Sequence, residues 1–218
     1  MDNPLNEIEC RVLACLYEKS ITTPEYYPLT QNAMMLAANQ KSNRNPAMNL
    51  SDAEVQAVVD TLKNRHLIWQ LTTAGGRVPK YEHNFGAAFK LDAAQCAVLC
   101  ELMVRGAQTA AELRANAGRM HAFAATADVE QVLMALQNRD DGALCTLLPR
   151  QSGQKESRYA HLLCGTVVSS VSVEASPVIG TAAPRDRVSV LEGEVSQLKA
   201  DVQMLKEALA KLNSELGV

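Results

Sequence analysis

The chain has 218 residues, a formal net charge of −3 and 47% apolar residues, enough for two small globular domains and an appendage. No apolar run approaches the roughly 18 residues of a membrane-spanning helix, and the N-terminus lacks the pattern of a signal peptide. We therefore expect a cytoplasmic protein with no membrane partner. Its charges are evenly spread, without the basic surplus typical of non-specific nucleic-acid binding.

The residues that usually carry catalysis or bind metals form no recognisable motif. The six cysteines include no CxxC pair, and none lies near histidines at zinc-finger spacing. In a reducing compartment we expect them to be buried free thiols. Nucleotide-binding motifs and Ser/His/Asp or Cys/His arrangements are also missing. The sequence therefore predicts a protein that is not an enzyme and has no cofactor and no metal.

The first part of the chain is predicted to form three helices followed by two strands. Apolar residues recur at i, i+3, i+4 and i+7 along the third helix, from Val55 to Leu62, which indicates one buried stripe. Ser51 and Glu54 have the spacing of a capping box at its start, and Thr30 begins the second helix. The expected helices are 6–18, 30–39 and 51–65, and the expected strands lie near 67–72 and 77–83.

The same order recurs further along, so the chain contains an internal repeat. The segment Leu5-Asn6-x-x-Glu9-Cys10 matches Leu91-Asp92-x-x-Gln95-Cys96, including the two residues of a capping box. Thr109 and Glu112 form another such box. The second set of helices is expected at 92–104, 109–117 and 127–138, with strands near 143–148 and 157–163.

Three helices followed by a two-stranded wing are typical of a winged-helix domain. The predicted fold is mainly α with small β wings, as two tandem winged-helix domains plus a C-terminal parallel dimeric coiled coil. The predicted parts are winged-helix domain 1 at 1–88, winged-helix domain 2 at 89–165, a flexible linker at 166–186 and a coiled-coil helix at 187–217.

The C-terminal segment carries a heptad pattern of Val and Leu. β-branched residues at position a with Leu at position d favour two parallel helices. Pairs that would face each other across such a dimer, for example Glu194 and Lys199, have opposite charge. The alternative is one amphipathic helix packed on its own domain, which would not need matched charges. We predict a parallel homodimer held by Val188, Leu191, Val195, Leu198, Val202, Leu205, Leu209, Leu212 and Leu216.

A polar block between the second and third helices is the first candidate binding site. Gln, Lys, Asn and Arg are the residue types that contact phosphates and base edges. The same residues could instead pin an irregular loop, with Asn caps and a terminating Pro. Two wing residues, Arg77 and Lys80, could add to a nucleic-acid contact. The candidates in the block are Gln40, Lys41, Ser42, Asn43 and Arg44.

Basic residues around the second helix of the repeat form another candidate group. Arg114 and Arg119 could hold phosphates or an acidic partner. Alternatively, Arg105 and Arg114 could be paired with Glu101 and Glu112 on a solvated face.

A Tyr-x-His pair occurs on the last strand of each wing. Tyr81 and His83 in the first unit correspond to Tyr159 and His161 in the second, and residues two apart face the same side of a strand. We interpret the pairs as hydrogen-bonding anchors between wing and body. A metal site would need further ligands, which the sequence does not indicate.

Several long sequence blocks stand out along the chain. They include Thr22-Thr23-Pro24, Asn39-Gln40-Lys41-Ser42-Asn43-Arg44, Lys80-Tyr81-Glu82-His83, Arg105-Gly106, Gln108-Thr109, Arg119-x-His121-x-Phe123 and Arg158-Tyr159-Ala160-His161. Over about residues 5–165 these blocks resemble the YceH-type family of bacterial proteins. The resemblance implies tandem winged-helix domains and no catalytic residues. The chain departs from the family pattern at Ala38, Ala107 and Ala111, where Cys, Pro and Gly are common.

Two functions from different classes remain. The first is a dimeric DNA-binding regulator, the usual role of paired winged helices. The second is a protein–protein adaptor that uses the winged helices as docking modules. The third helices begin with acidic residues such as Asp52 and Glu130, which repel phosphates and favour the adaptor. The 39–46 block and the dimeric architecture favour DNA, which we place first by a narrow margin.

Overall fold

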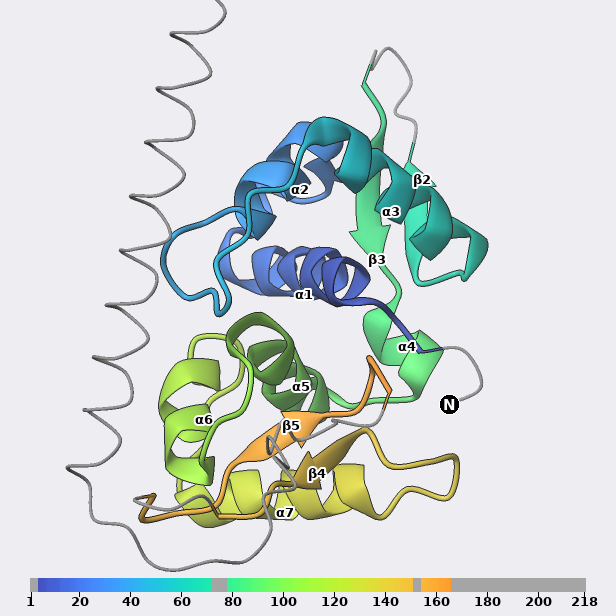
Figure 1. Ribbon diagram of the computed structural model, residues 1–218. Helices are drawn as coiled ribbons and strands as arrows, with labels where there is room; N and C mark the ends of the chain where they lie inside the picture. Colours follow the sequence, from blue (N-terminus) through green and yellow to red (C-terminus); the bar gives the residue numbers. More distant parts are fainter. Residues whose placement is uncertain (1–3, 72–77, 151–153, 166–218) are drawn as a thin grey trace, which may run out of the picture. The chain divides into compact units, whose positions relative to one another are not determined.

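The computed structural model describes residues 4–71, 78–150 and 154–165 (Figure 1). Within these residues the protein is mainly helical with two small antiparallel sheets, as predicted. Arg77, the expected linker and the heptad segment lie outside the described residues.

The order of three helices followed by two strands occurs twice along the described chain. All six predicted helices are present, although α1 runs four residues beyond its expected end. The first half contains α1 (Glu7–Thr22), a short 3-10 helix (Pro24–Tyr26), β1 (Leu29–Thr30), α2 (Gln31–Ala38), α3 (Asp52–Asn64), β2 (Ile68–Leu71) and β3 (Lys80–His83). The second half contains α4 (Phe85–Phe89), α5 (Ala93–Arg105), α6 (Ala110–Ala117), α7 (Thr126–Gln137), β4 (Cys145–Leu147) and β5 (Tyr159–His161).

The predicted capping boxes fix where four of the helices begin. At α1, the backbone N–H of Glu9 donates to Asn6 Oδ1 at 2.8 Å, and the N–H of Asn6 donates to the Glu9 carboxylate at 3.0 Å. The same reciprocal pair forms between Asp92 and Gln95 at α5. The boxes at α3 and α6 also form as predicted. Each box satisfies N–H groups that a helix start leaves unpaired.

In both sheets a third backbone segment pairs with the hairpin, as a short strand in the first and as a single residue in the second. In the first, β3 lies between β2 and β1, and the two-residue β1 was not predicted. In the second, β4 and β5 form a hairpin, and Gln108 takes the place of a third strand. The backbone N–H of Gln108 donates to Tyr159 O at 3.0 Å, and the N–H of Tyr159 donates back at 2.7 Å. Each hairpin therefore gains a third backbone segment.

The two halves share one apolar core, in which α1 packs against α5 (Figure 1). Residues 9–18 of α1 are all buried, and so are residues 96–104 of α5. A helix buried on all sides occupies the centre of a protein rather than its surface. The thiol of Cys100 donates to Ala14 O at 3.3 Å across this contact. α4, which was not predicted, contains residue 88, the expected end of the first domain.

The end of the second half returns to the beginning of the first. The backbone N–H of Leu5 donates to Leu163 O at 2.7 Å. Gly165, with φ at +89°, lies beside Pro4. The segment after β5 is thereby held against the start of α1. No helix among the described residues is long and apolar enough to cross a membrane.

Candidate functional site

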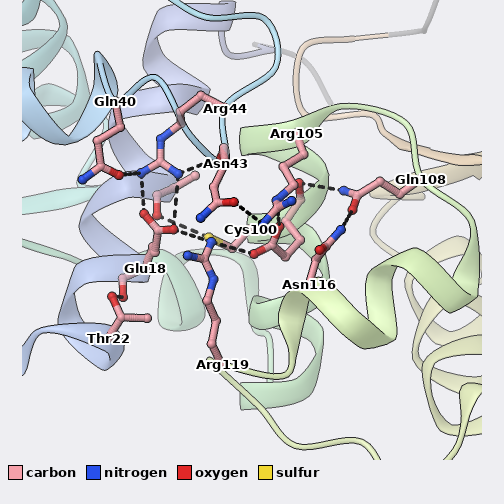
Figure 2. A network of polar contacts seen from close by, with 12 residues as sticks. Glu18, Thr22, Gln40, Asn43, Arg44, Cys100, Arg105, Gln108, Asn116 and Arg119 are labelled. Carbon is pink, nitrogen blue, oxygen red and sulfur yellow. Dashed lines mark hydrogen bonds and ion pairs between the residues drawn. The ribbon is translucent and has the colours of Figure 1, made fainter.

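Two buried carboxylates form the centre of a charge network between the halves (Figure 2). Glu18 lies on α1 and Glu101 on α5, and both side chains are at most 1% exposed. The guanidinium of Arg119, which follows α6, contacts both, and its Nη2 lies 2.9 Å from Glu101 Oε1. Arg119, a predicted binding residue, is therefore a bridge between the two first helices.

Arg44 pairs with Glu18 from the other side and is itself buried. Both of its terminal nitrogens donate to the Glu18 carboxylate, and Nη2 also donates to Gln40 Oε1 at 3.1 Å (Figure 2). Burial would raise the pKa of Glu18, but the hydrogen bond and charge of Arg44 and the charge of Arg119 lower it below its ordinary value. Of the two interpretations of this block, the geometry of Arg44 and Gln40 favours the structural one.

The loop 39–51 is closed on itself and tied to both halves. Asn39 and Leu50 exchange hydrogen bonds of 2.7 and 2.8 Å across its base. Buried Arg11 of α1 donates to Pro46 O at 2.8 Å. Arg105 of α5 donates to the side chain of Asn43 at 2.7 Å (Figure 2). Two predicted binding residues, Lys41 and Ser42, remain exposed at its tip.

A polar pocket of about 310 Å³ lies between this loop and the α5–α6 corner. Its cations are already paired. Both terminal nitrogens of Arg158 bind the Glu112 carboxylate at 2.9 Å. Arg105 Nε lies 3.0 Å from Glu101 Oε2, an ion contact too bent to be a hydrogen bond. The pocket therefore offers side-chain amides more than free charge. They belong to Asn43, Asn45, Gln108 and Asn116.

The alternative pairing of Arg114 with Glu112 does not form, because Arg158 binds that carboxylate. Arg114 Nη2 instead donates to Ala124 O at 2.7 Å and so fixes the segment before α7. The alternative pairing of Arg105 with Glu101 is confirmed. Arg158 was not identified as a partner, since it is distant in sequence.

The exposed sides of the third helices are acidic or uncharged. On α3, Asp52, Glu54 and Asp60 are exposed, whereas Lys63 donates to Gln70 of β2 at 2.6 Å. The hydrogen bonds from Ser51 lower the pKa of Glu54 below its ordinary value, so this carboxylate stays charged. α7 contains no Lys or Arg and exposes Met134. Neither face resembles a surface that attracts phosphate groups.

The first wing exposes apolar side chains, which sequence reasoning did not indicate, on a face that they share with Lys80 and Glu82 of β3. Trp69 is 43% exposed, Leu71 is 37% exposed, and Val78 is 59% exposed. On β2 the side chains of Ile68 and Gln70 turn towards the body, so Trp69 and Leu71 turn away from it. Lys80, a predicted contact residue, lies opposite Leu71 on β3. Side chains alternate between the two faces of β2, but the sequence did not show which of these faces is buried. The exposed position of Trp69 and Leu71 therefore could not be predicted.

The two Tyr-x-His pairs have different environments. His83 Nε2 lies 3.1 Å from the Ser20 hydroxyl of α1, which confirms the predicted anchor in the first half. The ring of His83 also packs edge-on against Tyr17. His161 Nδ1, by contrast, is buried and has no hydrogen-bond partner among the described residues. The repeated motif therefore serves as a complete anchor only in the first wing.

Comparison with known proteins gives the family of the chain. Residues 5–154 match the model of the DUF480 family, described as proteins of unknown function. The chain belongs to this family. A UPF0502 protein of Klebsiella pneumoniae (strain 342) is 47% identical over 211 residues, which cover 94% of this chain and 97% of the relative. The UPF0502 protein YceH of Salmonella paratyphi B is 44% identical over 221 aligned positions that cover both chains completely. The sequence thus matches its relatives beyond the helical halves as well as within them.

Proposed function

We propose that the protein is a non-enzymatic docking module, built from two winged-helix halves, that binds a partner protein through the outer face of its first wing. The exposure of Trp69, the one tryptophan of the chain, beside Leu71 and Val78 carries this proposal. Tryptophan is enriched among the residues that dominate the energy of protein interfaces, where a few anchors do most of the binding.

The charges next to the wing indicate the chemistry of the partner. Glu82 of β3 lies opposite Trp69 and shares its face of the sheet. Asp60 of α3 lies on the other face, since its charge, after the larger effect of burial, raises the pKa of Tyr81 on β3. Asp52 and Glu54 extend the acidic surface along α3. We therefore expect a partner segment that combines an apolar or aromatic anchor with basic residues, because opposite charges steer association and exclude wrong partners.

DNA binding has less support, because the basic side chains that would contact phosphates are engaged within the protein. Arg44 and Arg119 are paired with buried carboxylates, and Arg114 is bound to a backbone carbonyl. Of the basic contact residues predicted from the sequence, Lys41 at the loop tip and Lys80 on the wing are the two within the described residues that are not engaged in this way. DNA recognition stays a prediction of the sequence pattern.

Selection of displayed peptides on the full chain tests the proposal. Enriched peptides should share basic and apolar residues. Their affinity, measured by titration calorimetry, should fall about 30-fold in Trp69→Ser, since a central interface anchor contributes about 2 kcal/mol or more. Met134→Ser is the matched control, because Met134 is an exposed apolar residue on α7 in the other half.

Two results would contradict docking at this wing. One is equal affinity of the selected peptides for the Trp69→Ser protein and the unchanged protein. The other is enrichment of a bipartite site from random DNA duplexes, with an affinity that falls steeply with salt.

We also propose that the heptad segment pairs two copies and so doubles the number of docking faces. The Val and Leu spacing supports a parallel pair. Leu198→Asp combined with Leu205→Asp places charges in the expected seam and should halve the mass measured by light scattering. A mass that equals one chain before the substitutions would refute the pairing.

A further inference from the structure

Three side chains with metal-binding chemistry meet where the end of the second half reaches the start of the first. Cys10 lies on α1, His161 ends β5, and Cys164 follows three residues later. One candidate ligand atom from each lies within 4.8 Å of the others. The two sulfur atoms are 3.1 Å apart. The hydrogen bond between the backbones of Leu5 and Leu163 holds the two segments in this position.

The same three residues line a cavity of about 190 Å³. Glu7 also lines it, and its place one helical turn before Cys10 puts both on the same side of α1. The Cys10 side chain is buried, whereas Cys164 is partly exposed. The site is therefore enclosed on the α1 side and reachable from solvent near Cys164.

His161 is the residue that an ordinary core packing does not explain. Its counterpart in the first wing, His83, has the Ser20 hydroxyl as a partner. The buried Nδ1 of His161 has none among the described residues. Most buried polar atoms in proteins have a hydrogen-bond partner. A buried nitrogen without one therefore needs a specific explanation, such as a bound metal ion. A pair of hydrogen-bonded thiols alone would leave this histidine without a role.

We propose that Cys10, His161 and Cys164 bind a divalent cation with the ligand preferences of zinc. Zn²⁺ takes thiolate sulfur at about 2.3 Å and imidazole nitrogen at about 2.0–2.1 Å, so tetrahedral ligand atoms are about 3.4–3.8 Å apart. The two sulfurs, 3.1 Å apart, are slightly closer than that distance, and the separations to the imidazole nitrogen are at most 4.8 Å. Small rotations of the side chains would give the required geometry.

The ligand set also fits the cation in charge and number. Two thiolates with a neutral imidazole compensate a divalent charge, and binding releases the two thiol protons to solvent. The Glu7 carboxylate or a water molecule supplies the fourth ligand. The bound ion would clasp α1 to the segment after β5, and it would stabilise the folded state in proportion to its affinity.

The test uses the full chain, reduced and freed of metal with a chelator, and Co²⁺ as the probe. One Co²⁺ per chain should give the absorption of thiolate-bound tetrahedral cobalt, and one equivalent of Zn²⁺ should abolish it. Zinc should also protect two of the six thiols from a thiol reagent. Cys164→Ala should lose the absorption, and His161→Gln should weaken or change it.

Cys145→Ala is the matched control, because Cys145 is a buried thiol of the same half that donates to Leu133 O at 3.5 Å. It should keep the full cobalt signal. The partial exposure of Cys164 makes its removal mild for folding, which circular dichroism checks. A spectrum without thiolate ligation, or one that Cys164→Ala leaves unchanged, overturns the proposal. A chain that loses two thiols on air oxidation and binds no cobalt after reduction also overturns it, in favour of a disulfide between Cys10 and Cys164.

Discussion

The two halves of the molecule repeat the same order of elements but use their polar residues differently. Both begin their first helix with a capping box, Asn6 with Glu9 and Asp92 with Gln95. Their wings diverge. The first is anchored by His83 and turns Trp69 outwards, whereas the second leaves His161 without a partner beside two thiols. The repeat has retained the features that build the fold, so the features that differ are the better guide to function.

The largest effect is expected at the junction that the halves share. Glu18→Gln leaves Arg44 and Arg119 without one of their buried counter-charges and should lower the free energy of unfolding by about 3–5 kcal/mol. Denaturant unfolding of the full chain measures this. The control is Glu112→Gln, whose pair with Arg158 is more than a third exposed and should matter by about 1 kcal/mol or less. Equal costs would mean that the junction is no more important than the surface.

The same junction predicts a dependence on pH. The pKa of Glu18 is lowered in the folded state, so its contribution is complete above the ordinary glutamate pKa of about 4.3. It is lost as the pH falls through the lowered folded value. The stability difference between the unchanged protein and Glu18→Gln should therefore be constant above about pH 5 and shrink below pH 4. A gap that widens on acidification would contradict the assigned direction.

The difference between the wings is expected to have an intermediate effect. His83→Leu removes the bond to Ser20 and the edge contact with Tyr17 and should cost about 1–2 kcal/mol. In metal-free protein, His161→Leu removes a buried polar atom that has no partner and should be nearly neutral. Thermal unfolding of the two variants compares them. A similar loss in both would show that the wings are anchored alike.

The smallest effect is expected where the halves agree. Asn6→Ala and Asp92→Ala each remove one side of a capping box and should each cost about 1 kcal/mol. Urea unfolding measures both, with Gln56→Ala on the exposed side of α3 as a control. Clearly unequal costs would show that the two first helices are not equivalent in stability.

The sequence predicted those parts of the fold that depend on neighbouring residues. Capping boxes and helical periodicity are local, and the helices they predicted are present. The two-residue β1 and α4 were missed because each is too short to produce a periodic pattern. β1 exists only through its pairing with Tyr81 and Lys80, far along the chain.

The candidate site was less predictable, because its contacts join residues remote in sequence. Arg158 reaches Glu112 across 46 positions, so the alternative in which nearby Arg114 pairs with Glu112 does not hold. Cys10 and Cys164 are separated by 154 positions, and no spacing rule links them. The burial of Arg44 could not be inferred either. A loop rich in Asn, Lys and Arg has the same composition whether it packs between the two halves or binds a ligand.

The contact of α1 with α5 also limits which amino-acid substitutions the two halves of the repeat can accept. Ala14 is fully buried, and its carbonyl accepts from the Cys100 thiol of the opposite helix. A bulkier side chain at either position has no solvent to turn towards, and overpacking a filled interior costs about 1–3 kcal/mol. Substitutions in one copy must therefore be matched by compensating ones in the other, and variation in this protein is expected in coupled pairs across that seam.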